Sequence, residues 1–89
     1  MLKITKMQES GRDVLLKLEG KITEQWAALL DGECRAYLRR RKAVFLDCSN
    51  VEYIDVRGTE VLKALPHSHV TLVSTPTFMT ELLQIGGRL

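Results

Sequence analysis

Residues 45–62 decide the fold, and they read Phe45-Leu46-Asp47-Cys48-Ser49-Asn50-Val51-Glu52-Tyr53-Ile54-Asp55-Val56-Arg57-Gly58-Thr59-Glu60-Val61-Leu62. The stretch begins as a buried strand, passes through a polar turn at residues 47–50 and returns to apolar residues before Asp55. Asp55 and Gly58 then mark the start of a short helix, which we expect over residues 58–65. A strand, loop and helix start of this kind leave free backbone N–H groups at the end of the strand. In open α/β sheets, that edge is where ligands and partners usually bind.

Two strands and a long helix precede this stretch. Residues 2–5 alternate apolar and polar side chains, which predicts a half-buried edge strand, and residues 14–18 repeat the alternation. The turn between them is short and contains Gly11, so we expect an antiparallel hairpin. Residues 23–41 have helical periodicity, with Thr23 as the N-cap. The apolar face of this helix consists of Trp26, Ala27, Leu30, Cys34, Tyr37 and Leu38.

The remaining segments complete the sheet. Residues 43–46 form a continuous apolar run, which suits a central strand covered on both faces, and the β-branched residues 70–73 predict the last strand. A final helix opens at Thr75 and Pro76 and stops at residues 86–87. Its apolar face consists of Phe78, Met79, Leu82, Leu83 and Ile85. The order β-β-α-β-α-β-α predicts an α/β fold with a four-stranded mixed sheet, and right-handed crossovers place the helices of the later βα units on one side of it.

Length and composition bound the class of protein. The chain has 89 residues, which we expect to form one domain over residues 1–89, and its formal net charge of +2 does not support nucleic-acid binding. No apolar run approaches the roughly 20 residues that cross a bilayer, so we expect no membrane insertion. The first residues lack the apolar segment of a signal peptide, which predicts a cytoplasmic protein. Cys34 and Cys48 fit that expectation as reduced thiols.

The central stretch resembles the signature of STAS domains, the family of bacterial anti-sigma factor antagonists. That signature usually reads Asp-Leu-Ser-x-Val-x-Phe-Ile-Asp-Ser-Ser-Gly-Leu. The positions that match in this chain are Asp47, Ser49, Val51, Tyr53, Ile54, Asp55 and Gly58. Val56 and Arg57 stand in place of the two serines, and Thr59 stands in place of an apolar residue. The resemblance implies a single STAS-like domain that binds another protein.

The residues that could carry catalysis or bind a metal do not form a set. His67 and His69 form a His-x-His pair, but no cysteine or carboxylate lies near them in the sequence. Asp47 and Asp55 could flank one cleft, although the simpler interpretation is that Asp47 orders the turn and Asp55 caps the next helix. The basic run at residues 39–42 is interpreted as a solvated helix end rather than a contact for anionic lipid or nucleic acid. The sequence therefore predicts no metal, no cofactor and no enzymatic activity.

The resemblance also bears on regulation. In STAS domains that switch sigma factors, a kinase phosphorylates the second serine of the Asp-Ser-Ser-Gly motif. The phosphate lies at a helix N-terminus and adds about two negative charges to the docking surface. Arg57 occupies that acceptor position here, so the resemblance implies docking without serine phosphorylation. Thr59 is the alternative acceptor in this turn, although a threonine at a helix start is more often structural.

We therefore expect a non-enzymatic regulatory module that resembles an anti-sigma factor antagonist and is a monomer or weak dimer. The expected docking surface consists of Ser49, Asn50, Asp55, Val56, Arg57, Gly58, Thr59, Glu60 and Lys63. The commonest partner in the family is an anti-sigma factor, which is an ATP-dependent serine kinase. Two alternatives remain open: the STAS subunit of a lipid-transporting ABC system, which docks on the ATPase, and a scaffold component of a signalling assembly.

Overall fold

Strands β2 (Asp13–Ile22) and β3 (Ala43–Ile54) form the centre of the fold in the computed structural model, which describes residues 1–83. The two strands pair in parallel, and β4 (Val70–Val73) extends the sheet in parallel beyond β3. On the other side, β1 (Leu2–Glu9) pairs with β2 in antiparallel fashion, as the short turn between them predicts. The sheet order is therefore β1-β2-β3-β4, and the predicted four-stranded mixed sheet is confirmed.

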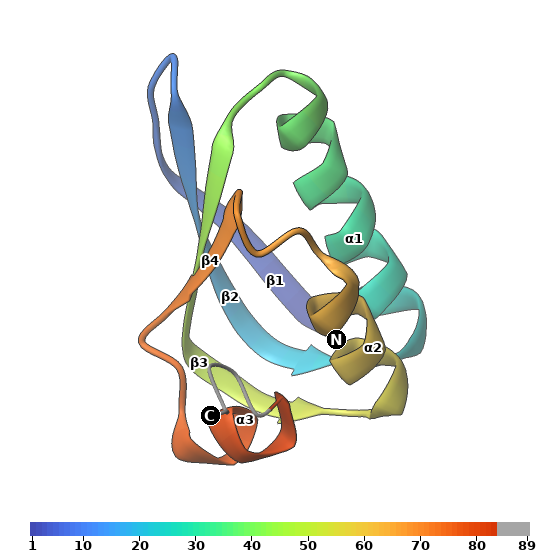
Figure 1. The fold of residues 1–89 in the computed structure, drawn as a ribbon. Helices are drawn as coiled ribbons and strands as arrows, with labels where there is room; N and C mark the ends of the chain where they lie inside the picture. Colours follow the sequence, from blue (N-terminus) through green and yellow to red (C-terminus); the bar gives the residue numbers. More distant parts are fainter. Residues whose placement is uncertain (84–89) are drawn as a thin grey trace.

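The helices within residues 1–83 are α1 (Glu24–Arg39), α2 (Val56–Ala64) and α3 (Thr77–Leu83). α1 and α2 pack against each other on one face of the sheet (Figure 1), as expected for two right-handed crossovers that advance from β2 to β4. The predicted element order, β-β-α-β-α-β-α, is confirmed. The predicted helix stop at residues 86–87, together with Ile85, lies outside the described residues. No helix in the described part of the chain is long and apolar enough to cross a membrane.

The hydrophobic core lies between the sheet and the packed helices. The β2 side chains that point toward the helices are almost completely buried, as their alternation predicts: Val14, Leu16 and Leu18. The fully buried side chains of α1 come from its predicted apolar face: Ala27, Leu30 and Cys34. Each large aliphatic side chain buried in this way is worth about 1.5–3 kcal/mol, so this interface dominates stability. On the opposite face of the sheet Leu15 and Phe45 are only half-buried, so β3 is not covered equally on both faces.

The predicted polar turn at residues 47–50 is wrong, because β3 continues through it to Ile54. β2 also runs on to Ile22 and stays paired with β3, so tertiary pairing overrides the local turn signal. The local turn chemistry is nevertheless present, since the Ser49 N–H donates to Asp47 Oδ1 at 3.0 Å. The register of the β2–β3 pair shifts at this point, so the polar segment forms a bulge rather than the end of a strand.

The starts of α1, α2 and α3 all differ in detail from expectation. Thr23 precedes α1 as predicted, but its side chain makes no capping hydrogen bond. α3 begins at Thr77, one residue after the predicted start at Pro76. α2 begins at Val56, two residues earlier than the predicted start at Gly58, and its last residue is Ala64. The early end agrees with Pro66, which cannot continue a helix.

Candidate protein-binding surface

Asp55 organises the region where the sheet meets both central helices. Its backbone is extended, and its Oδ1 accepts a hydrogen bond from the Gly58 N–H at 2.7 Å, which confirms Asp55 as the N-cap of α2. Its Oδ2 accepts a second hydrogen bond from the Glu24 N–H at 3.1 Å, at the start of α1. The Asp55 N–H in turn donates to the Ile22 carbonyl oxygen at 3.3 Å, at the end of β2. One carboxylate therefore holds the starts of two helices against the end of the sheet.

Gly58 is needed for close packing rather than for an exposed anion cradle. It is buried, and a Cβ atom at this position would lie 2.3 Å from the Ile22 carbonyl oxygen and 2.8 Å from Ile54 Cγ1. Only glycine allows the first turn of α2 to approach β2 this closely. The expectation that Gly58 opens the helix with a free amide is wrong, because α2 begins at Val56 and the Gly58 N–H is already bonded to Asp55.

The start of α2 exposes a mixture of apolar and charged side chains. Val56 is 75% exposed, and Arg57, Glu60 and Lys63 are also exposed. Thr59 is half-buried, and its Oγ1 donates to the backbone oxygen of Asp55 at 3.0 Å. The helix start (residues 55–59) thus has a fixed backbone and presents the side chains of its first turn to solvent.

Two shallow hollows flank the helix start. The first hollow, of about 480 Å³, lies between the starts of α1 and α2 and is lined by Glu24, Gln25, Ala28, Asp55, Val56, Arg57 and Glu60. The second hollow, of about 560 Å³, lies between the end of β3, α2 and α3 and is lined by Tyr53, Ile54, Asp55, Val56, Thr59, Glu60, Lys63 and Leu82. Tyr53 and Leu82 are 53% and 48% exposed, so both add apolar surface beside Val56.

The structure brings most of the predicted site residues together, but not all of them. The predicted residues that line one or both hollows are Asp55, Val56, Arg57, Thr59, Glu60 and Lys63. Gly58 lies beneath them, and Ser49 and Asn50 lie within β3 and line neither hollow. Sequence reasoning missed Tyr53, Leu82 and Glu24 as members of the surface. Tyr53 is part of the signature stretch and Leu82 was assigned to the apolar face of α3, so only their exposure was unforeseen.

Titratable groups outside the helix start have structural explanations. The Glu9 carboxylate accepts hydrogen bonds from Lys42 Nζ at 2.6 Å and Lys6 Nζ at 2.9 Å, which lower the pKa of Glu9 to about 2. Burial raises the pKa of the Cys34 and Cys48 thiols to about 12, so neither is a nucleophile at neutral pH. Within residues 1–83, no three or more histidine, cysteine, aspartate or glutamate side chains are grouped to hold a metal ion.

The family model described as "Mlab, STAS domain" matches residues 5–88, and the chain therefore belongs to the STAS domain family. Among solved structures, it is similar to the anti-sigma factor antagonist SpoIIAA in its unphosphorylated form. That match has a TM-score of 0.74 at 10% sequence identity and covers 94% of this chain and 84% of SpoIIAA.

A second similar structure is an uncharacterized protein from Shewanella loihica PV-4, of the DUF3478 family with a SpoIIAA-like fold. The TM-score is 0.59 at 11% identity, and the match covers 94% of this chain and 75% of that protein. At such low identity both matches show the fold alone. A comparison with curated protein sequences found no match.

Proposed function

We propose that this domain is a non-enzymatic regulatory module that docks a partner protein through the helix start and its two hollows, without serine phosphorylation. The observation that carries the proposal is the group of exposed apolar side chains, Tyr53, Val56 and Leu82, around a helix start that Asp55 holds in place. Exposed aromatic and aliphatic side chains inside a charged rim are the usual anatomy of a protein interface. A backbone that is already ordered also reduces the entropy lost on binding.

Arg57, a charged residue of the proposed docking surface, favours a docking role that does not depend on phosphorylation. Arg57 stands where the family signature carries its acceptor serine, and it lacks the side-chain hydroxyl that a serine kinase phosphorylates. Incubation with an anti-sigma factor kinase and ATP should therefore leave Arg57 unmodified. Any phosphoryl label is expected on Thr59, the hydroxyl of the helix start, or nowhere in the chain. Label on Ser49 or Ser68 would contradict the placement of the regulatory surface at α2.

The first candidate partner is an anti-sigma factor with kinase activity, because the fold is that of an anti-sigma factor antagonist. The second candidate is an ABC-type ATPase, with this chain as the STAS subunit of a lipid-transport system. Arg57 favours the second candidate, because that docking role needs no acceptor serine. Co-purification with the tagged domain separates the two candidates. Recovery of a kinase of the histidine-kinase-like ATPase fold supports the first, and recovery of an ABC ATPase supports the second. Recovery of a non-ATPase receptor or adaptor would instead indicate a scaffold component of a signalling assembly.

Site-specific photo-crosslinking tests the surface directly. Benzoylphenylalanine at Val56 should crosslink to the partner, because this position is 75% exposed between the two hollows. The same group at Thr71, an exposed position on β4, is the matched control and should give no crosslink. Benzoylphenylalanine at Ser49 tests, by the same crosslinking, whether the exposed bulge of β3 belongs to the interface. Crosslinks from Thr71 but not from Val56 would refute docking at the helix start.

Affinity measurements then test the role of the fixed cation. Arg57→Glu is expected to weaken partner binding by about tenfold or more, as the loss and reversal of a charge within an interface typically does. Arg12→Glu, in the exposed turn that joins β1 to β2 at the opposite end of β2 from Ile22, also reverses a charge and should leave the affinity unchanged. Equal affinity of the Arg57→Glu variant and the wild type would remove Arg57 from the interface.

A further inference from the structure

The four consecutive cations that follow Leu38 do not share one environment. Lys42 Nζ lies 2.6 Å from Glu9 Oε2, and Arg40 Nη2 lies 3.2 Å from the same carboxylate oxygen. These two cations are therefore committed to Glu9. Arg39 and Arg41 are exposed and form no ion pair with any residue of the described chain, residues 1–83. The solvated helix end predicted from the sequence thus divides into two cations that pair with Glu9, which also binds Lys6, and two that are unpaired.

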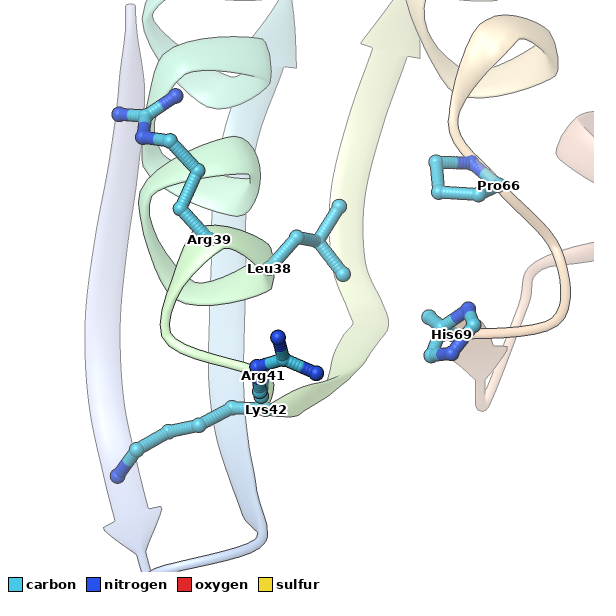
Figure 2. A pocket seen from close by; sticks show the side chains of 6 residues that line it. All are labelled: Leu38, Arg39, Arg41, Lys42, Pro66 and His69. Carbon is cyan, nitrogen blue, oxygen red and sulfur yellow. The ribbon is translucent and has the colours of Figure 1, made fainter.

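A hollow of about 480 Å³ opens beside the unpaired cations, between the end of α1 and the loop that leads into β4. It is lined by Leu38, Arg39, Arg41, Lys42, Pro66 and His69. Figure 2 shows the Arg41 guanidinium directed toward the gap between α1 and the loop that carries Pro66 and His69. The Lys42 side chain extends the other way, toward β1, where Glu9 binds it (Figure 2). No carboxylate lines this hollow, so its charge is not balanced locally.

The backbone of Arg41 provides a second, independent observation. Its φ is +63°, in the left-handed region that side chains other than glycine rarely adopt. The Arg41 N–H donates to the Leu38 oxygen at 2.9 Å and the Lys42 N–H donates to the Tyr37 oxygen at 3.2 Å. This pair of bonds is the Schellman motif, in which the left-handed position is usually glycine. An arginine here keeps a strained backbone that glycine would relieve, and it places a guanidinium at the hollow, as expected for a side chain that binds a ligand.

The dipole of α1 opposes an anion at this end, but it does not decide the sign of the local field. A helix C-terminus carries about half a negative charge, whereas the Arg41 guanidinium carries a full positive charge and is directed toward the gap (Figure 2). The last carbonyl groups of α1 also accept hydrogen bonds from the Schellman motif, which weakens their repulsion of an anion. Across the hollow, Ser68 Oγ lies 2.8 Å from His69 Nδ1, so the Nε2 side of the ring is the side left to meet a ligand.

We propose that this hollow binds a phosphoryl group, carried either by a soluble phosphate ester or by a lipid headgroup. A guanidinium fork binds two oxygens of an oxyanion at once. A carboxylate has no further oxygen to offer, whereas a phosphoryl group keeps a third one for a donor on the opposite wall, the His69 ring. Leu38 and Pro66 supply apolar walls for the rest of the ligand. The site lies at the end of α1 away from the start of α2 (Figure 1), so it does not depend on the proposed docking surface.

Titration of the isotope-labelled chain with inorganic phosphate and with phenyl phosphate, followed by NMR at constant ionic strength, tests the site. Saturable amide shifts are expected at residues 38–42 and 66–70. Arg41→Gly removes the guanidinium and relieves the backbone strain, so phosphate binding should weaken at least about tenfold, which is about 1.4 kcal/mol, while Tm rises. Arg41→Lys keeps the charge without the fork and should lose an intermediate part of the affinity. Lys3→Gln removes one unit of charge from β1 and should change neither quantity.

A vesicle arm identifies the source of the phosphoryl group. Binding to phosphatidylcholine vesicles that contain phosphatidic acid, a phosphate monoester with three terminal oxygens, supports a lipid headgroup if phenyl phosphate gives no saturable response and Arg41→Gly loses the vesicle binding. A saturable response to phenyl phosphate without vesicle binding supports a soluble ester. Shifts that spread over the whole surface, or equal effects of Arg41→Gly and Lys3→Gln, would overturn the site. A response to polyglutamate but not to either phosphate probe or to the vesicles would also overturn it, in favour of an acidic protein.

Discussion

Replacing Asp55 by alanine should destabilise the domain more than an ordinary surface substitution does. The change removes both hydrogen bonds that the carboxylate accepts, from the Gly58 N–H at 2.7 Å and from the Glu24 N–H at 3.1 Å. Loss of one helix cap typically costs about 1 kcal/mol, and a buried donor left without a partner adds to that. Gly58 is buried, so we expect a total loss of about 2–3 kcal/mol in the free energy of unfolding. For a domain of this size, such a loss lowers Tm by about 10–20 °C.

Asparagine at the same position separates the two bonds. Its side chain has one acceptor oxygen, so Asp55→Asn can keep the Gly58 cap while losing the bond to Glu24. The expected cost is therefore about half that of alanine. Glu24 has a φ of +43°, so loss of its bond to Asp55 should also allow the first residue of α1 to relax.

Urea unfolding followed by Trp26 fluorescence and by circular dichroism measures these losses. Asp31→Ala is the matched control, because it removes a carboxylate of α1 whose recorded partner is Arg35, four residues along the same helix. An exposed pair of this kind is worth about 0.5 kcal/mol or less. If Asp55→Ala costs no more than this control, or if asparagine and alanine at position 55 cost the same, the double-cap explanation is refuted.

Three further outcomes follow from the geometry. Gly58→Ala should cost about 3 kcal/mol in urea unfolding, because the added Cβ would lie 2.3 Å from the rigid Ile22 carbonyl oxygen; wild-type stability would contradict this packing. The folded pKa of Glu9 is about 2 against an ordinary 4.5, so its contribution is complete above pH 4.5 and is lost as pH falls toward 2. As pH falls through this window, the free energy of unfolding should therefore fall less steeply in Glu9→Gln than in the wild type. Equal slopes in the two proteins would contradict a stabilising role for ionised Glu9. Cys34 and Cys48 are buried with thiol pKa values of about 12, so Ellman's reagent should react only at the rate of unfolding, and labelling within the mixing time would show them accessible.

The order and type of the elements could be predicted from the sequence because each element carries its own local signal. Alternation in β2 and helical spacing in α1 reflect which side chains face the core, and both faces are where the periodicity places them. Asp55 could be identified as a cap because an aspartate just before a helical pattern has that preference on local grounds. Its second bond, to Glu24, joins residues 31 positions apart and has no local signal.

The errors arise where a distant partner overrides a local preference. Asp47, Ser49 and Asn50 are turn-forming residues, and their local hydrogen bonding is indeed that of a turn. β2 supplies a paired neighbour as far as Ile22, so the same residues become a bulge within β3. Ser49 and Asn50 are therefore held on the strand rather than folded toward α2, and they line neither hollow.

The basic run at residues 39–42 shows that the pairing of charges, too, cannot be predicted from local sequence. Four consecutive cations at a helix end are typical of a solvated surface, and the sequence offers no means to divide them. Glu9, at the end of β1, decides which cations are paired. It lies 33 residues before Lys42 in the sequence, so this ion pair forms only in the folded chain. Which cations remain unpaired is therefore a property of the tertiary fold, and so is the candidate site at Arg41.

Arg57 is best understood by comparing its effect on stability with its expected effect on binding. A cation in the first turn of a helix opposes the dipole by about 0.3–1 kcal/mol, and an anion there is favoured by a similar amount. Arg57→Glu should therefore raise the free energy of unfolding by about 1 kcal/mol, even as it weakens partner binding. Opposite signs in the two measurements would mean that the arginine is retained at the expense of stability, as expected for a contact residue. A variant that loses stability and affinity together would instead assign Arg57 to the fold.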